Sequence, residues 1–484
     1  MDQPWWQRAV FYQVYLRSFA DSNRDGVGDL RGVIDKLGYL EWLGIDALWL
    51  SPPTVSPDRD WGYDVADYRQ IQAVLGTLDE LDELVAEARK RGIRIVLDLV
   101  PNHTSDRHPW FQDARASRGA RHRSWYVWAD PKPDGSLPNN WRSSFGQGSA
   151  WKRSPETGQL YLHSFLPEQV DLDWWNDEVR REFDDIMRFW LDRGIAGFRL
   201  DVAHAIVKDR LLRDIPDDYD KNVLVDIDET FAVLRRWRSL VDAYEEPRIL
   251  LGETWVMDLE RLAGFYGTGT DQLHLAFNFP FTFSKLEAKA LPDVVARSEA
   301  AFPPGAWPVW MLSNHDIPRA ATRMCGGDER KIRCALLALL TLRGTAVLYQ
   351  GDELGLEQAD VPPDRIRDVD GRDGCRTPMP WTPEGGWTDP WLPLGDTARN
   401  VVDQREDPTS TLSFVRELIA RRRATADLLA GGYEELPAPP GVWAYRRGEG
   451  TEVAINLSNE PVEVELGSGR RRLGAWEGGV FGSS

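Results

Sequence analysis

The strongest constraint on the fold is a regular alternation of short apolar runs with helical patterns. Eight runs read as buried strands: VFYQVYLRSF, DALWLSP, IRIVLDLV, GFRLDVA, ILLGET, LHLAFNF, VWMLSN and TAVLYQGDE. Helical spacing fills the stretches between them, as where Leu78, Leu81 and Leu84 share one face and Gly92 follows as a stop signal. Eight strands that alternate with helices predict an α/β protein, a (β/α)8 TIM barrel rather than an open sheet.

Two stretches depart from this alternation. Residues 103–174 are rich in Trp, Pro, Gly and Ser and show no strong helical pattern. A structureless loop of that length is rare in a compact domain, so an inserted subdomain after the third strand is predicted. Near the end, GVWAYRRG, TEVAINLS and PVEVEL read as alternating strands of a small C-terminal β domain. The expected division is a barrel at 1–102 and 175–424, an inserted subdomain at 103–174 and a C-terminal domain at 425–484.

Composition excludes several classes of function. The formal net charge of -19 argues against nucleic acid and anionic membranes as partners. Three scattered cysteines (Cys325, Cys334 and Cys375) do not make a disulfide framework or a zinc site. The N-terminal residues lack the pattern of a signal peptide, and the longest apolar run is broken by Arg343 and Gly344. These features predict a cytoplasmic protein, either a monomer or a homodimer.

Charged residues gather where the predicted strands end, which is where (β/α)8 barrels carry their active sites. In GFRLDVAH, Arg199 and Asp201 project from one face of a strand that reads as buried. A buried charge is costly unless it is paired or used. The other strand ends contribute Asp98, Asn102, His103, His204, Glu253, Asn314, His315 and Asp316. Carboxylates that meet at one end of the barrel repel each other, so this set predicts a catalytic role rather than stabilisation of the fold.

The chemistry that needs such a set is glycoside hydrolysis. One ionised carboxylate attacks the anomeric carbon, and one protonated carboxyl donates to the leaving oxygen. Neighbouring carboxylates keep the acid protonated, while a nearby arginine keeps the nucleophile ionised. Arg199 is therefore expected to hold Asp201 charged and aimed.

The segments DLVPNH, GFRLDVAH, GETW and SNHD occur in this order and resemble the four signature regions of the α-amylase superfamily, glycoside hydrolase family 13. The similarity extends over nearly the whole chain. The resemblance implies that Asp201 is the nucleophile, Glu253 the general acid/base and Asp316 the transition-state stabiliser. It makes further residues candidates for the subsite that holds the cleaved sugar: His103, Arg199, His204 and His315.

Finer features resemble the oligo-1,6-glucosidase and α-glucosidase branch, namely NNWRSSFGQGSAW, LYLHSFLPEQVDLDW and RDGCRTPMPW. By this resemblance Asp60 and Arg376 grip the terminal glucose, Tyr63 stacks under it and Phe145 forms a wall. Phe165 lies near the next subsite in this interpretation; the alternative is an ordinary core aromatic.

The segment DSNRDGVGDL suggests a structural cation site. Its oxygen donors alternate with small residues, a spacing that turns ligands inward around a hard cation. The predicted ligands of Ca²⁺ or Mg²⁺ are Asp21, Asn23, Asp25, the Val27 carbonyl and Asp29. In the branch the chain resembles, this loop binds calcium or magnesium away from the chemistry. The alternative is an Asx-rich surface turn.

Departures from the pattern leave the linkage open. Val202 follows the nucleophile as in many α-1,6-specific members, whereas Ala203 and His204 resemble α-1,4-specific α-glucosidases. Residues 169–173 read QVDLD where the branch often has QPDLN.

Three hypotheses follow. The first is a retaining exo-α-glucosidase acting on maltose-type or other short α-glucosides, without an organic cofactor. The second is a transglucosylase on the same scaffold, which passes the glucosyl group to a sugar or alcohol. The third is an inactive relative that serves as a partner subunit, but such relatives lose the carboxylates that this chain keeps.

Overall fold

The computed structural model describes residues 3–146, 148–216 and 228–482. Its centre is a parallel barrel made of β1 (Val10–Val14), β2 (Ala47–Leu50), β5 (Arg94–Leu99), β11 (Gly197–Leu200), β12 (Ile249–Gly252), β13 (Leu275–Ala276), β14 (Val309–Met311) and β15 (Thr345–Tyr349). β1 pairs with both β2 and β15, and a parallel bridge from Phe277 to Val309 joins the remaining two edges. The predicted (β/α)8 barrel and all eight predicted strands are confirmed.

Alternation along each strand builds two cores. Phe11, Trp49 and Val347 belong to a compact cluster inside the barrel, and their sequence neighbours Leu48 and Leu348 pack in a second cluster with the surrounding helices. Every residue of β1, β2 and β15 is buried, which explains why these strands read as continuous apolar runs.

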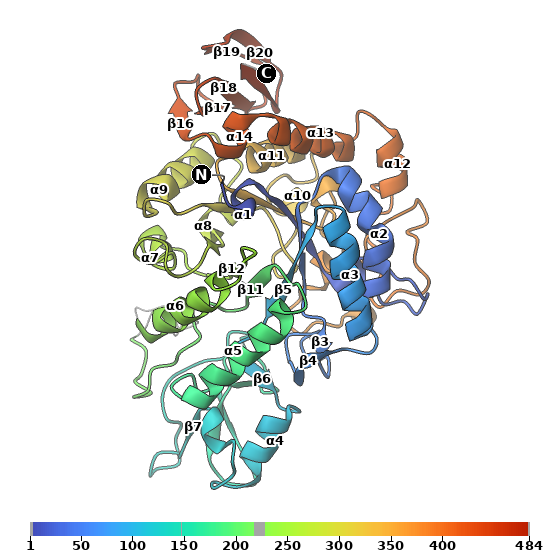
Figure 1. The fold of residues 1–484 in the computed structure, drawn as a ribbon. Helices are drawn as coiled ribbons and strands as arrows, with labels where there is room; N and C mark the ends of the chain where they lie inside the picture. The colour runs from blue at the N-terminus through green and yellow to red at the C-terminus, as the bar shows by residue number, and fades with distance from the viewer. Residues whose placement is uncertain (1–2, 147, 217–227, 483–484) are drawn as a thin grey trace.

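Helices cover the outside of the barrel (Figure 1). The longer ones are α2 (Leu30–Leu43), α3 (Leu78–Lys90), α5 (Asp177–Leu191), α6 (Asp228–Asp242), α9 (Ala290–Ala301), α11 (Glu329–Thr341) and α13 (Thr411–Ala424). The shorter ones are α1 (Trp5–Arg8), α7 (Leu259–Gly264), α8 (Phe279–Thr282), α10 (Ala320–Arg323), α12 (Val401–Glu406) and α14 (Ala426–Ala430). α3 begins with a capping box between Thr77 and Glu80 and stops just before Gly92, which has a φ of +73°. Among the described residues, no helix is long and apolar enough to cross a membrane.

The stretch between β5 and α5 contains secondary structure of its own. It holds β6 (His103–Ser105), α4 (Pro109–Ala116), β7 (Trp128–Ala129), β8 (Trp151–Arg153), β9 (Leu160–Leu162) and β10 (Gln169–Asp171). β7, β9 and β8 form one sheet, and β10 pairs antiparallel with β6. Helix α4 was not expected; it starts at Pro109 after an N-cap from His108, a short signal within an otherwise loop-like composition. Two short strands precede this stretch, β3 (Thr54–Val55) and β4 (Asp67–Ile71).

The C-terminal β domain lies at the opposite end of the molecule from the inserted stretch (Figure 1). It contains β16 (Tyr433–Leu436), β17 (Val442–Arg447), β18 (Thr451–Asn456), β19 (Val462–Leu466), β20 (Gly469–Leu473) and β21 (Glu477–Gly482). The buried Arg447 donates to the Thr341 carbonyl at the end of α11, which fastens this domain to the barrel.

Candidate active site

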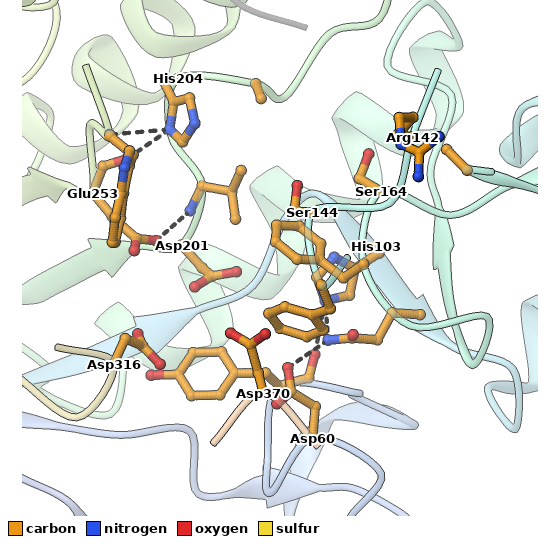
Figure 2. A pocket seen from close by; sticks show the side chains of 18 of the residues that line it. Asp60, His103, Arg142, Ser144, Ser164, Asp201, His204, Glu253, Asp316 and Asp370 are labelled. Atoms are coloured by element: carbon orange, nitrogen blue, oxygen red, sulfur yellow. Dashed lines mark hydrogen bonds between the residues drawn. The ribbon is translucent and has the colours of Figure 1, made fainter. Parts of the chain in front are cut away.

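The predicted site residues meet around one cavity of about 300 Å³ (Figure 2). Those that line it are Asp60, Tyr63, His103, Phe145, Phe165, Asp201, His204, Glu253 and Asp316. Three other predicted residues, Arg199, His315 and Arg376, do not line the cavity, and each is fully buried behind its wall. The strand ends and the inserted stretch thus enclose a single space.

Arg199 joins three carboxylates from neighbouring strands. Its Nη1 lies 2.7 Å from Oδ1 of Asp98 and 2.8 Å from Oδ1 of Asp201, and its Nη2 lies 2.9 Å from Oε2 of Glu253. Asp98 also accepts hydrogen bonds from Tyr63 and Trp49. A single guanidinium cannot balance three negative charges, so these carboxylates compete for it.

The charge state of this cluster differs from the expectation. Burial raises the pKa of Asp201 well above its usual value, and Arg199 lowers it only in part, because Glu253 and Asp98 act in the same direction as burial. Burial likewise raises the pKa of Asp98 to about 6. Arg199 therefore aims Asp201 but does not by itself hold it ionised. Because Asp98 and Asp201 share Arg199, the protonation of each affects the other.

A strained residue connects the two central carboxyl groups. Val202 has a φ of +47°, a left-handed conformation that is unfavourable for a β-branched side chain. In this conformation its backbone N–H donates to Oε2 of Glu253 at 2.9 Å. Among the described residues, Oε1 of Glu253 and Oδ2 of Asp201 have no hydrogen-bond partner, and both side chains border the cavity. One oxygen of each carboxyl group is thus held while the other stays available.

A second cluster surrounds Asp316. Arg372 and Arg376 donate to its Oδ1 at 3.0 and 2.8 Å. Burial would raise the pKa of Asp316, but His315, Arg372 and Arg376 together hold it below its usual range. Burial lowers the pKa of His315 well below its usual value, although Asp316 acts in the opposite direction, and Arg372 and Arg376 carry the permanent positive charge. Asp316 is therefore a stable carboxylate.

Arg372 lines the cavity, whereas the predicted Arg376 is buried behind the cavity wall. Arg372 donates to Oδ1 of Asp60 at 2.5 Å as well as to Asp316, whereas Nε of Arg376 donates to the His315 carbonyl. A 3₁₀ turn at Asp373–Cys375 separates the two arginines. The sequence showed both in GRDGCRT and could not tell which one that turn directs at the cavity.

Among the other cavity residues that were not predicted are Gln169, Trp255 and Asp370. Gln169 donates to Oδ2 of Asp60 at 2.8 Å, so the Asp60 carboxylate is held from two sides. The pairing of β10 with β6 brings Gln169 to this position, a contact between residues that are distant in sequence.

Aromatic rings complete the wall. Tyr63 stacks on His315 with ring centres 5.2 Å apart and planes 8° apart. Phe145 and Phe165 meet edge to face at 5.3 Å, and Phe165 lies 5.4 Å from the ring of His103. Phe165 is thus part of the cavity wall and not only core packing.

The predicted cation loop lies outside this cavity. Backbone N–H groups of the loop donate to the side-chain oxygens of Asp21, Asn23 and Asp25, and Asp29 caps α2 through Gly32. Hard oxygen donors of this kind suit Ca²⁺ or Mg²⁺. In the described parts of the chain, no group of three or more His, Cys, Asp or Glu side chains is arranged to hold a metal ion.

The chain is similar over almost its full length to known glycoside hydrolases. The alpha amylase catalytic domain matches residues 13–432. A probable alpha-glucosidase of Rhizobium meliloti (strain 1021) is 40% identical, covering 99% of this chain and 94% of the relative. An oligo-1,6-glucosidase of Heyndrickxia coagulans is 35% identical, covering 95% and 93%. The crystal structure of an alpha-glucosyl transfer enzyme matches with a TM-score of 0.93 at 38% identity, covering 100% of both chains. This chain therefore belongs to the α-amylase family, in its α-glucosidase and oligo-1,6-glucosidase branch, and is a glycoside hydrolase.

Proposed function

We propose that this enzyme is a retaining, exo-acting α-glucosidase that releases α-glucose from the non-reducing end of short α-glucosides. The observation that carries the proposal is the pair of carboxyl groups with one held and one available oxygen each, Asp201 and Glu253. A retaining mechanism needs one of them as nucleophile and the other as proton donor.

In the proposed first step, Oδ2 of Asp201 attacks the anomeric carbon while Glu253 gives its proton to the glycosidic oxygen. The bond to the leaving group breaks, and a glucosyl ester of Asp201 forms. In the second step, Glu253 takes a proton from water, and the water oxygen displaces Asp201 to release α-glucose. The ionised Asp316 stabilises the positive charge that develops on the sugar ring in both steps.

The proposed exo action rests on the closed end formed by Asp60, Arg372 and Gln169. A terminal glucose can hydrogen-bond to these groups through its free hydroxyls, whereas a longer chain would have to continue through the closed end. The enzyme should therefore release glucose from maltose-sized substrates and scarcely act on starch. Early products from soluble starch provide the test: mixed maltooligosaccharides would overturn the exo assignment.

Transfer of the glucosyl group to a sugar or alcohol is the second candidate activity. A solved structure that shares this fold, at 38% identity, is named an alpha-glucosyl transfer enzyme. The two activities differ in what attacks the glucosyl ester. Incubation with maltose, isomaltose, trehalose and sucrose at low and high concentration, followed by chromatography, separates them. Constituent monosaccharides alone at high concentration support hydrolysis, and newly formed saccharides indicate transfer.

The loop from Asp21 to Asp29 is proposed to hold a structural Ca²⁺ or Mg²⁺. Gly26 adopts a φ of +88°, and an added Cβ would lie 2.2 Å from the Asp389 carbonyl, so the tight turn itself is fixed by packing. A cation that binds only the folded state raises its stability. Chelation should lower the melting temperature; an unchanged value, with no metal in the purified protein, would contradict the site.

A further inference from the structure

The loop that follows β11 borders two cavities. Asp201 and His204 line the active-site cavity, whereas Lys208 and Arg210 line a second cavity of about 610 Å³. The inserted stretch forms another part of the wall of this second cavity, with residues between Arg118 and Trp128. No described residue lines both cavities, and the volume of the second one is typical of sites for small molecules. The second cavity is therefore a separate candidate for ligand binding.

Basic side chains outnumber acidic ones around the second cavity. Four basic residues and two acidic residues border it: Arg118, Arg123, Lys208 and Arg210, against Asp173 and Asp209. The whole chain has a formal net charge of -19, so this local excess of positive charge is opposite in sign to that of the protein. A cavity with such an excess attracts anions.

The two acids do not balance the arginines of the second cavity. Oδ2 of Asp209 accepts a hydrogen bond from Nε of Arg213 at 2.7 Å, and Arg213 does not border the cavity. Burial raises the pKa of Asp173, whose carboxylate accepts a backbone hydrogen bond at 3.0 Å. Nζ of Lys208 lies 3.2 Å from Oδ2 of the buried Asp171. The unbalanced positive charge therefore belongs to the arginines.

These three arginines lack a buried acidic partner. Arg118 pairs with Asp130, but both side chains are more than half exposed, and such pairs contribute little. Within the described parts of the chain, Arg123 donates to uncharged oxygens, and Arg210 makes no hydrogen bond or ion pair. Burial and the neighbouring Arg118 both lower the pKa of Arg123. An anion beside these two arginines would relieve their repulsion.

Aromatic rings hold two of the arginines in place. The guanidinium carbon of Arg123 lies 3.3 Å from the ring centre of Trp128, and that of Arg210 lies 5.5 Å from the ring centre of Trp175. Trp128 is itself stacked on the buried Phe111. A guanidinium that rests on a ring keeps the N–H groups at its edge for an oxyanion. Nε1 of Trp128 is also buried and has no hydrogen-bond partner among the described residues, which leaves a further donor in this wall.

We propose that the second cavity binds a small phosphate-bearing ligand, either inorganic phosphate or a sugar phosphate, through Arg118, Arg123 and Arg210. A phosphate group carries about two negative charges near neutral pH and has three acceptor oxygens, which suits several arginines better than a single carboxylate does. The volume of about 610 Å³ also leaves space for a sugar ring beside the phosphate. The inference goes beyond the proposed function, because it uses no residue of the active-site cavity.

Isothermal titration calorimetry with inorganic phosphate and with glucose 6-phosphate tests this proposal. We expect saturable binding that weakens as salt is added, because Arg118 and Arg210 are exposed. Tighter binding of glucose 6-phosphate than of phosphate would identify a sugar phosphate as the ligand, and equal affinities would identify the phosphate group alone. Arg210→Gln and Arg123→Gln should each weaken binding about tenfold, because each removes a charged donor.

Two variants serve as controls. Arg153→Gln removes an exposed arginine of the inserted stretch that does not border the second cavity, and Arg372→Lys changes the active-site cavity. Neither should change the affinity for phosphate or glucose 6-phosphate. If Arg123→Gln lowers the melting temperature, Arg210→Gln decides.

Three results would overturn the inference. The first is the absence of saturable binding of either ligand. The second is an affinity that Arg210→Gln leaves unchanged while Arg372→Lys lowers it, which would place the ligand in the active-site cavity. The third is an equal loss in Arg153→Gln and Arg210→Gln, which would mean that surface charge attracts the anion without a specific site.

Discussion

Arg199 and Arg372 belong to neighbouring clusters that differ in their balance of charge. Around Arg199, one guanidinium faces Asp98, Asp201 and Glu253. Around Asp316, two guanidinium groups are shared among Asp60, Asp316 and Asp368, and both of them donate to Asp316. Both clusters are removed from water, yet the pKa of Asp201 is raised while that of Asp316 is lowered.

The difference shows that burial alone does not set the charge of these acids. The number of cations per carboxylate decides whether a proton is retained. With one cation for three carboxylates the pKa of Asp201 is raised, whereas with two cations for three carboxylates Asp316 keeps a fixed negative charge where positive charge develops. The cluster around Asp316 thereby supplies the stabilising charge that the proposed mechanism requires.

The largest expected effect comes from neutralising the cation-poor cluster. Asp201→Asn and Glu253→Gln should each lower kcat by about 10⁴-fold or more, because each group acts in the transition state. Folding should persist, because neither change leaves a buried charge without compensation. Steady-state kinetics and thermal melting measure the two quantities.

Glu353→Gln is the control for those two variants. Glu353 is fully buried, accepts hydrogen bonds from Tyr12 and Tyr39, and has a pKa raised to about 7, but it does not border the cavity. Its replacement should leave kcat within a factor of a few. Comparable losses in all three variants would mean that buried carboxyl groups serve the fold and not the reaction.

An intermediate effect is expected in the cation-rich cluster. Arg372→Lys keeps a charge but cannot reach Asp60 and Asp316 together. Loss of one partner in a buried pair costs about 2–5 kcal/mol, so kcat/KM should fall by roughly 10²-fold or more, with a higher KM. Arg376→Lys should mainly lower the melting temperature. Equal KM changes in both variants would contradict the placement of Arg372 alone in the cavity wall.

Features that depend on local sequence could be predicted, and features that depend on contacts between distant residues could not. The eight strands could be predicted because they are buried on both faces and read as apolar runs. Once the strands are placed, the polar residues at their ends become candidates, because (β/α)8 barrels carry their active sites there. The position of Gln169 depends on a pairing between β10 and β6, and that of Arg372 on a 3₁₀ turn, neither of which spacing reveals.

The charge state of Asp201 could not be predicted from the sequence for another reason. The sequence contains the arginine that lowers its pKa, but not the depth of burial or the two further carboxylates that share the same guanidinium. An electrostatic prediction needs the surroundings of a group as well as its nearest partner.

The smallest effect is a shift in pH dependence. Asp98 raises the pKa of Asp201 by repulsion and also shares Arg199. Asp98→Asn should therefore lower that pKa and move the acidic limb of kcat/KM toward lower pH, by about one unit. Asp368→Asn, beside Arg372 in the other cluster, should leave the limb in place. A limb that moves to higher pH in Asp98→Asn would contradict the shared-arginine account.

The most direct test of the account is the configuration of the first product. Proton NMR during the first moments of maltose or methyl α-glucoside cleavage distinguishes α-glucose from β-glucose before the two interconvert. Nucleophilic attack by Asp201 followed by water predicts α-glucose, with β-glucose accumulating only through later mutarotation. Initial release of β-glucose would mean that water attacks directly, and it would contradict the roles proposed for Asp201 and Glu253.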